Sequence, residues 1–297
     1  MIEIHSCPVC HGTNFVPFIA CNDNTVSHET FQIVQCVSCS LSFTNPRPAD
    51  EELAKYYASS TYISHQQRAQ SFIDKIYLFV RHFTLRWKLK LIQNNTLLAG
   101  KNLLDFGCGT GEFIRVAKSN GWQTTGVEPS QNARDAALPE VSSDISPSLD
   151  AISANTRFDV ITLWHVLEHV PDLNSTIQQL KSRCAEHGTI FIAVPNHSSY
   201  DGNHYKENWA GYDVPRHLWH FNRHAMKTLI EKNSMVIQKI IPMRLDAYYV
   251  SMLSEKYKRN GKSSFTSLLE AVITASRSNN RAKQDMQYSS LIYVVTT

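Results

Sequence analysis

A glycine-rich stretch at residues 105–111 has the composition of a turn that holds a nucleotide-like ligand. It reads DFGCGTG and follows a short apolar run. Glycines let a backbone approach a ligand closely and accept positive φ angles, and a helix that begins there offers free N–H groups. The dinucleotide fingerprint G-x-G-x-x-G has its third glycine where this chain has Glu112. A carboxylate is a poor neighbour for a pyrophosphate, so the spacing favours a ligand without phosphate.

Two acidic residues follow this stretch at distances that suit the same ligand. Glu128, with Pro129 beside it, ends a predicted strand at 123–128, 17 residues after Gly111. An acid at that strand tip can accept hydrogen bonds from both hydroxyls of a ribose. Asp144 is a candidate for the adenine side of the ligand, and a solvated loop aspartate is an equal alternative for it.

Residues 158–172, FDVITLWHVLEHVPD, predict a buried strand followed by a polar turn. With the glycine-rich stretch and Glu128, this segment resembles the motifs of class I S-adenosylmethionine-dependent methyltransferases, notably those of ubiquinone biosynthesis and of sugar and polysaccharide pathways. The resemblance covers residues 101–297. It implies S-adenosylmethionine as cofactor and a doubly wound, Rossmann-like α/β sheet of seven strands with the last antiparallel. It also places Trp164 and His165 beside the donor methyl group. The candidate cofactor-binding residues are therefore Asp105, Gly107, Cys108, Gly109, Gly111, Glu128, Pro129, Asp144, Trp164 and His165.

The turn after that strand contains His165, Glu168 and His169 in the order H-x-x-E-H. Inverted zinc proteases share these letters, but they need a long helix, whereas here a strand precedes the turn and Pro171 ends it. In the ubiquinone-pathway enzymes the stretch reads E-x-L-E-H and is implicated in binding a divalent metal, so the resemblance implies a Mg²⁺ site. Mg²⁺ prefers oxygen ligands, and His165 stands where those enzymes have Glu. The favoured alternative is that Glu168 and His169 hydrogen-bond the turn itself.

A second cluster of histidines follows the predicted strand at 189–194. Residues 213–221, DVPRHLWHF, resemble a stretch of the polysaccharide-type methyltransferases. An ordinary imidazole titrates near pH 6.5, so His217 or His220 is suited to act as a general base. The alternative is that Arg216 pairs with Asp213 to hold the loop. The candidate catalytic residues are His165, His217 and His220.

Two C-x-x-C pairs near the N-terminus have the spacing of a structural zinc site. Twenty-five residues separate the pairs, and four thiolates at such spacing close a tetrahedral Zn²⁺ site with no open position. The stretch resembles the zinc module of certain sugar C-methyltransferases. Zinc ribbons also bind nucleic acids, but residues 1–48 hold one Arg and no Lys to neutralise phosphates. The candidate metal ligands are Cys7, Cys10, Cys36 and Cys39.

Strand and helix patterns alternate from Lys101 onward, which is typical of a doubly wound parallel sheet. We expect three regions: a zinc-ribbon-like module at 1–48, a helical linker at 49–100, and a methyltransferase domain at 101–297 with a helical insertion at about 246–285. Asp50 is a candidate helix cap. The helix expected at 66–98 has a basic face, and a helix that covers the domain is favoured over one that lies on a membrane.

Composition and net charge argue against some classes of function. The net charge is +3, too mild to indicate a nucleic-acid partner. No apolar run approaches a membrane span, and the first residues lack the basic segment and the apolar segment of a secretory signal, so a cytoplasmic protein is expected. The expected function is methyl transfer to a small molecule, with a saccharide or polysaccharide precursor as acceptor. The alternatives are O-methylation of a quinone-like phenol, RNA or DNA methylation, and a non-catalytic protein that binds zinc or cofactor to mediate an interaction.

Overall fold

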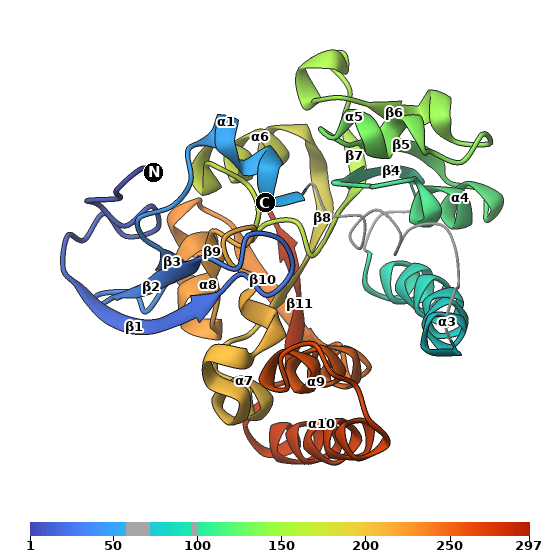
Figure 1. Ribbon diagram of the computed structural model, residues 1–297. Coiled ribbons are helices and arrows are strands. Elements are labelled where there is room, and N and C mark those ends of the chain that lie inside the picture. Colours follow the sequence, from blue (N-terminus) through green and yellow to red (C-terminus); the bar gives the residue numbers. More distant parts are fainter. Residues whose placement is uncertain (58–71, 97–99) are drawn as a thin grey trace.

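The computed structural model describes residues 1–57, 72–96 and 100–297, with side chains of the helix α3 (Phe72–Asn95) described from residue 83. Two β-sheets organise these residues (Figure 1). The larger sheet has seven strands in the order β10-β11-β8-β7-β4-β5-β6. β11 is antiparallel to both of its neighbours, whereas β4 to β8 run parallel. This confirms the predicted sheet and its antiparallel last strand. The strands are β4 (Asn102–Phe106), β5 (Gln123–Val127), β6 (Ile145–Ser146), β7 (Phe158–Trp164), β8 (Cys184–Pro195), β10 (Val236–Pro242) and β11 (Ser290–Thr296).

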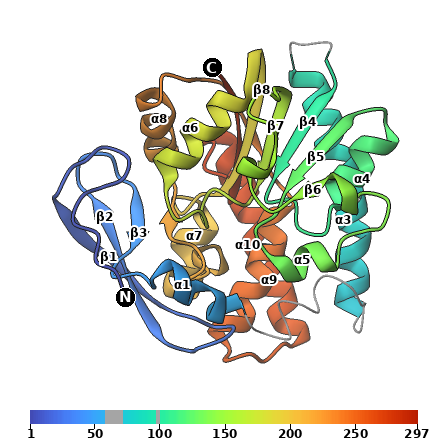
Figure 2. The same ribbon diagram turned by 90° about the horizontal axis from the view of Figure 1, so that it is seen from above.

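Helices cover both faces of this sheet (Figure 2). On one face, apolar residues of α6 (Leu173–Arg183) and α8 (Arg223–Lys232) join one core with side chains of the central strands. On the other face, α3 and α4 (Glu112–Ser119) form a second core with the alternate residues of the same strands. The central strands read as nearly continuous apolar runs because both of their faces are buried. The remaining short elements between β5 and β7 are α5 (Gln131–Asp135), η2 (Ser142–Asp144) and η3 (Leu149–Ala151).

The caps of α8 and α1 differ. Asn222 caps α8, since its side chain accepts a hydrogen bond from the N–H of Ala225. The cap of α1 (Asp50–Leu53) is Ala49 and not Asp50, because Asp50 is already helical and its carboxylate pairs with Arg47 at 2.6 Å. The predicted helix at 66–98 is described as α3 from Phe72 to Asn95, and its predicted residues 66–71 and 97–98 lie outside the described residues.

The smaller sheet joins the N-terminal region to the loop that follows β8. Its order is β1-β2-β3-β9, formed by β1 (Phe15–Asn22), β2 (Thr30–Cys36), β3 (Ser42–Thr44) and β9 (Trp219–His220). The last strand therefore comes from a point more than 170 residues further along the chain, and Ser42 pairs with His220. The linker that follows contains α1 and η1 (Ala54–Tyr57).

Two long helices lie between β10 and β11, where the insertion at 246–285 was expected. They are α9 (Asp246–Lys258) and α10 (Phe265–Asp285), which pack side by side at the lower end of Figure 1. The loop after β8 contributes α7 (Tyr200–Tyr205), η4 (Lys206–Asn208) and η5 (Ala210–Tyr212). The buried carboxylate of Asp201 joins these parts, because it accepts hydrogen bonds from Trp209, Ser278 and Ser289. Within the described part of the chain, none of the helices has the length and apolar character that crossing a bilayer requires.

Candidate active site at the strand tips

The glycine-rich stretch forms a tight turn between β4 and α4, at the carboxyl edge of the sheet. Gly107, Gly109 and Gly111 all have positive φ angles, of +74°, +57° and +83°. A Cβ at position 107 would collide with the side chain of Val166, whereas a Cβ at position 109 would meet no described atom within 4 Å. The backbone at Gly109 is therefore open to a ligand, and both its conformation and this access require glycine.

Glu128 lies directly beside that open backbone. Its Oε2 accepts a hydrogen bond from the N–H of Gly109 at 2.9 Å, and its Oε1 accepts one from Ser130 at 2.9 Å. The structure thus brings together the tip of β5 and the turn after β4, as the sequence predicted for the two halves of one cofactor site. Pro129 is exposed next to it. A ligand with two hydroxyls can reach the Glu128 carboxylate from the side that Gly109 leaves open.

Asp105 and Cys108 support the glycine-rich turn from the side of the protein interior. Asp105 is buried at the end of β4 and accepts a hydrogen bond from Thr162 Oγ1 at 2.7 Å. Burial raises the pKa of Asp105 to about 7, although the hydrogen bond from Thr162 and the charge of Lys88 oppose the shift. Burial also raises the pKa of the Cys108 thiol, with the nearby Asp105 carboxylate adding to it. Cys108 therefore stays a thiol, which is consistent with a packing role within the turn.

Asp144 is not brought to this site. It immediately precedes β6, and its carboxylate accepts hydrogen bonds from Lys118 Nζ at 2.8 Å and Thr124 Oγ1 at 2.9 Å. β6 runs parallel to β5 with Val127 opposite Ser146, so the cofactor edge follows Ser146 and not Asp144. Asp144 therefore matches neither expectation: it does not follow β6 at the cofactor edge, and it is paired with Lys118 and Thr124 and not a solvated loop aspartate.

Trp164 lies at the tip of β7, on the other side of β4 from Glu128. Its ring packs edge-on against Phe113 with a centroid distance of 5.6 Å, and Lys88 Nζ lies 4.4 Å from the ring centre. Lys88 comes from α3 and places a cation at the strand tips. Sequence reasoning missed Lys88, because α3 carries several basic residues on one face and nothing in the pattern distinguishes this one.

His165 is held between two carboxylates. It follows β7 with a φ of +58°, its Nε2 lies 2.9 Å from Asp246 Oδ2, and its Nδ1 lies 3.3 Å from Glu168 Oε1. Burial lowers its pKa, but Asp246 and Glu168 outweigh this and raise the pKa to about 9. His165 is therefore protonated at neutral pH with both ring nitrogens engaged, so it is not a free base in this state. Asp246, the first residue of α9, was missed, because its partner is 81 residues away in sequence.

Glu168, His169 and His217 form a cluster beside this pair. One ligand atom from each lies within 4.8 Å of the others. Glu168 is fully buried, and neither of its oxygens has a hydrogen-bond partner among the described residues, since the contact with His165 lacks hydrogen-bond geometry. Burial raises the pKa of Glu168, but the neighbouring His165 outweighs this and lowers it. Glu168 is thus a buried anion that lacks a full set of partners.

The two histidines of the cluster are each held at Nδ1. Nδ1 of His169 lies 3.0 Å from the carbonyl oxygen of Arg216 and 3.0 Å from the hydroxyl of Tyr57, and Nδ1 of His217 lies 2.9 Å from the carbonyl oxygen of Gly211. A carbonyl oxygen only accepts, so Nδ1 of His217 carries a proton. Metal-binding histidines commonly have one ring nitrogen held in this way. Burial lowers the pKa of His169 to about 4, so its imidazole is neutral.

His220 and Arg216 lie in the packing between the two sheets. His220 is buried on β9, and its Nε2 lies 3.2 Å from Thr44 Oγ1. Access of an acceptor to His220 would require this packing to open, so its placement favours a packing role. Arg216 binds Asp213 at 2.7 Å, which confirms the predicted pair, and it also binds Asp23 of the N-terminal region at 3.0 Å.

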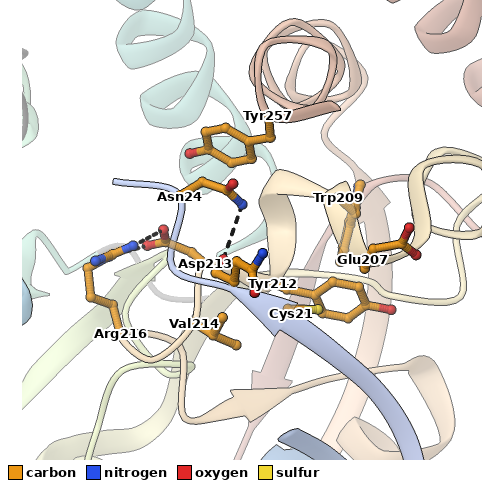
Figure 3. A pocket seen from close by; sticks show the side chains of 10 residues that line it. Cys21, Asn24, Glu207, Trp209, Tyr212, Asp213, Val214, Arg216 and Tyr257 are labelled. Carbon is orange, nitrogen blue, oxygen red and sulfur yellow. Dashed lines mark hydrogen bonds and ion pairs between the residues drawn. The ribbon is translucent and has the colours of Figure 1, made fainter. Parts of the chain in front are cut away.

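A small pocket lies at the same junction (Figure 3). It is lined by residues of β1, of the loop after β8 and of α9, among them Cys21, Trp209 and Tyr257. The Arg216–Asp213 pair borders it (Figure 3). No residue of the glycine-rich turn lines this pocket, so it is separate from the candidate cofactor site.

The four predicted zinc ligands converge at the base of the smaller sheet. Their sulfur atoms all lie within 4.8 Å of one another, with Cys7 3.5 Å from Cys39 and Cys10 3.4 Å from Cys36. The hydrogen bond with Cys39 lowers the pKa of Cys7 to about 5, against the effect of burial. Four sulfurs at these distances fit a tetrahedral Zn²⁺ ion.

This chain resembles known methyltransferases in sequence. A family model described as "Methyltransferase domain" matches residues 26–236, which is well over half of the chain. The ubiquinone biosynthesis O-methyltransferase of Methylococcus capsulatus is 30% identical over 119 residues, which are 37% of this chain and 50% of that protein. That of Nitrosospira multiformis is 32% identical over 117 residues, or 37% and 49%. The chain thus spans about half the length of these relatives.

The likeness to solved structures concerns the fold. The magnesium protoporphyrin IX methyltransferase from Synechocystis PCC 6803, solved with bound SAH, has a TM-score of 0.53 at 13% identity, covering 83% of this chain and 99% of that chain. The family match and the seven-stranded sheet confirm the resemblance that the sequence motifs carried. The chain therefore belongs to the methyltransferase-domain family and has the class I fold of its S-adenosylmethionine-dependent members.

Proposed function

We propose that this protein transfers the methyl group of S-adenosylmethionine to a hydroxyl group of a small molecule. The observation that carries the proposal is the Glu128 carboxylate beside the open backbone of Gly109. There, Glu128 would accept hydrogen bonds from the ribose hydroxyls. The sheet order supports a binding mode in which the other end of the cofactor would lie on the β7 side of β4, toward Trp164.

S-adenosylmethionine, when bound, supplies a methyl group that its sulfonium already activates. The protein must therefore align the acceptor oxygen with that methyl group and exclude water. Trp164 and the turn at His165 occupy the tip of β7, where the methyl group would lie. The carboxylates of Asp246 and Glu168 flank the ring of His165 at this tip.

The His165–Asp246 pair is the proposed site of the acceptor hydroxyl. Asp246 retains 22% side-chain exposure, whereas Glu168 on the other side of the ring retains 1%. An acceptor can thus approach Asp246 but not Glu168. Asp246 receives the hydroxyl proton as the methyl group is transferred, and His165 holds that carboxylate in place. His217 and His220, which are buried and contact other groups, take no part in the proton transfer.

Two acceptor classes follow from different observations. The four-cysteine region resembles that of sugar methyltransferases, which favours a saccharide precursor. The relatives named above are O-methyltransferases of ubiquinone biosynthesis, which favours a phenol. A phenol ionises near pH 10, far more easily than a sugar hydroxyl, and so it suits a carboxylate as proton acceptor.

Two metal ions complete the proposal. Zn²⁺ at Cys7, Cys10, Cys36 and Cys39 is structural. Glu168, His169 and His217 hold a second divalent cation, and their two imidazoles suit Zn²⁺, Mn²⁺ or Fe²⁺ better than the Mg²⁺ that the family resemblance implied. Metal analysis of the purified protein tests this: His217→Ala should lose the second ion and His220→Ala should keep it. Equal metal content in both variants would remove the second site.

A methylation screen tests the proposed activity. Purified protein is incubated with S-adenosylmethionine and either nucleotide sugars or substituted phenols, and S-adenosylhomocysteine is quantified by mass spectrometry. The Glu128→Ala variant serves as the negative control in each reaction. Acceptor-dependent product with the wild-type protein alone supports the proposal and selects the acceptor class. Product in neither set, although the cofactor binds, would contradict transfer to these hydroxyls.

A further inference from the structure

Helix α10 has its large apolar residues on the outside. Its buried positions are small or hydroxyl-bearing, namely Ser267, Ala271, Thr274, Ala275, Ser278 and Ala282. Its exposed positions include Phe265 at 81%, Leu268 at 40%, Leu269 at 52%, Val272 at 42% and Ile273 at 41% exposure. These five residues, at steps of three and four, form one face of two helical turns. We call them the α10 stripe. A soluble surface helix normally has the reverse arrangement.

A basic turn adjoins the stripe at the start of α10. Residues 256–264 contain Lys256, Lys258, Arg259 and Lys262 and no acidic residue. The three lysines are exposed. Arg259 pairs with Glu270 at 2.8 Å, so the acid nearest in sequence on α10 is already engaged. The turn therefore presents a net positive charge directly beside Phe265, the most exposed member of the stripe.

We propose that the α10 stripe and the basic turn dock on a membrane surface that contains anionic lipid. Apolar side chains that enter the acyl boundary beside lysines that meet anionic headgroups are the features of an interfacial helix. The lysines supply the charge complementarity that such a surface requires.

A second copy of the chain fits this face less well. A stable dimer buries about 20–30 residues on each side, and the stripe offers five. The charge of the basic turn would also meet like charge wherever two copies approached each other through this turn. Both features favour the lipid surface.

The docking face is linked to the candidate active site. α9 begins at Asp246, beside His165, and ends at the basic turn, about 20 Å away along a 13-residue helix. Docking would therefore bring the strand tips near the membrane, where an acceptor with an apolar tail would be held. This link rests on the proposed function, whereas docking itself does not.

Vesicle sedimentation tests the docking. The full chain is mixed with phosphatidylcholine vesicles, and with vesicles in which about half of the lipid is phosphatidylglycerol. We expect binding to the anionic vesicles only, and weakening as salt is raised. The double variant Phe265→Ser/Leu269→Ser should bind at least about tenfold more weakly. Lys258→Glu/Lys262→Glu should lose most of the preference for anionic lipid. Val236→Ser, which removes a side chain that is 56% exposed on the edge strand β10, should bind like the wild type.

Two results would overturn the proposal. The first is a wild-type protein that does not sediment with anionic vesicles at low salt. The second is a wild-type dimer in analytical ultracentrifugation that Phe265→Ser/Leu269→Ser converts to a monomer, which would assign the stripe to a second copy. Cofactor binding is measured on the same samples. Retained cofactor binding without vesicle binding refutes the docking and leaves the proposed function standing.

Discussion

Arg216 Nη2 and Asp23 Oδ1 lie 3.0 Å apart between side chains that are both buried, and 193 residues separate them in sequence. Asp23 also accepts hydrogen bonds from the backbone N–H groups of Thr25, Val26 and Ser27. The Arg216 guanidinium also donates hydrogen bonds to Asp213 and to the carbonyl oxygen of Tyr56. Because both charges have nearly complete partners, the pair fixes the N-terminal region against the loop that carries His217.

The pair makes stability depend on pH in a defined direction. Burial raises the pKa of Asp23, but the hydrogen bonds from Ser27 and Arg216 outweigh this and hold it well below the usual value. The pair therefore stabilises the fold above about pH 4, where the unfolded carboxyl is ionised, and the effect declines as the pH falls. Asp23→Asn should lower the free energy of unfolding by about 3–5 kcal/mol at pH 7.

Urea denaturation at pH 7 and at about pH 3 measures this effect. The difference between wild type and Asp23→Asn should shrink at the lower pH. Asp150→Asn, at an exposed position, should match the wild type at both values. A difference that stays constant with pH would show that the Asp23 carboxylate does not supply the stabilisation.

The four-cysteine site predicts a selective loss of metal. Cys36→Ser should reduce the zinc content of this site from about one ion per chain to none, because a structural site needs all four ligands. Its thermal midpoint should fall as the ion is lost. Cys21→Ser makes the same chemical change at another buried cysteine, outside the cluster, and should keep the zinc. Equal zinc content in the two variants would contradict the assignment of the ligands.

The contact between His165 and Asp246 predicts a loss of turnover without a loss of cofactor binding. Asp246→Asn removes the exposed carboxylate, so kcat should fall about 100-fold or more. The dissociation constant of S-adenosylmethionine should change little, because Glu128, at the tip of β5, lies across β4 from the tip of β7 that His165 follows. Kinetics and calorimetry on the same preparation check this, with Asp150→Asn as the control. An Asp246→Asn enzyme with wild-type kcat would remove this pair from the proton transfer.

Local patterns predicted the framework of the site. The glycines, the acid 17 residues beyond them and the apolar strand before His165 each have a fixed spacing, and strand tips in a parallel sheet meet at one edge. The turn at 105–111 and Glu128 are therefore found together as expected. The zinc ligands could also be predicted from the sequence, because each C-x-x-C pair is a local pattern. A structural zinc site needs four ligands, so the two pairs together indicate one site.

The residues that contact His165 and His217 could not be predicted from the sequence in the same way. Asp246 reaches His165 only because α9 begins at the end of β10, and Lys88 reaches Trp164 only through the packing of α3. β9, which consists of Trp219 and His220, carries no strand signal of its own and exists because β3 offers a free edge. The pairing of β9 with β3 buries His220 and brings Glu168 beside His217. Hydrophobic periodicity in the sequence does not predict either contact.

Calorimetric titration with S-adenosylmethionine tests the central claim most directly. The wild-type protein should bind with a dissociation constant below about 1 mM. Gly109→Val should not bind measurably, because the valine side chain would occupy the open space next to the backbone at position 109, beside Glu128. Gly261→Val is the matched control, since Gly261 also has a positive φ, of +84°, and open space, but lies in the turn between α9 and α10. Absence of binding to the wild type at millimolar cofactor, or equal binding by Gly109→Val, would contradict the assignment of the glycine-rich turn.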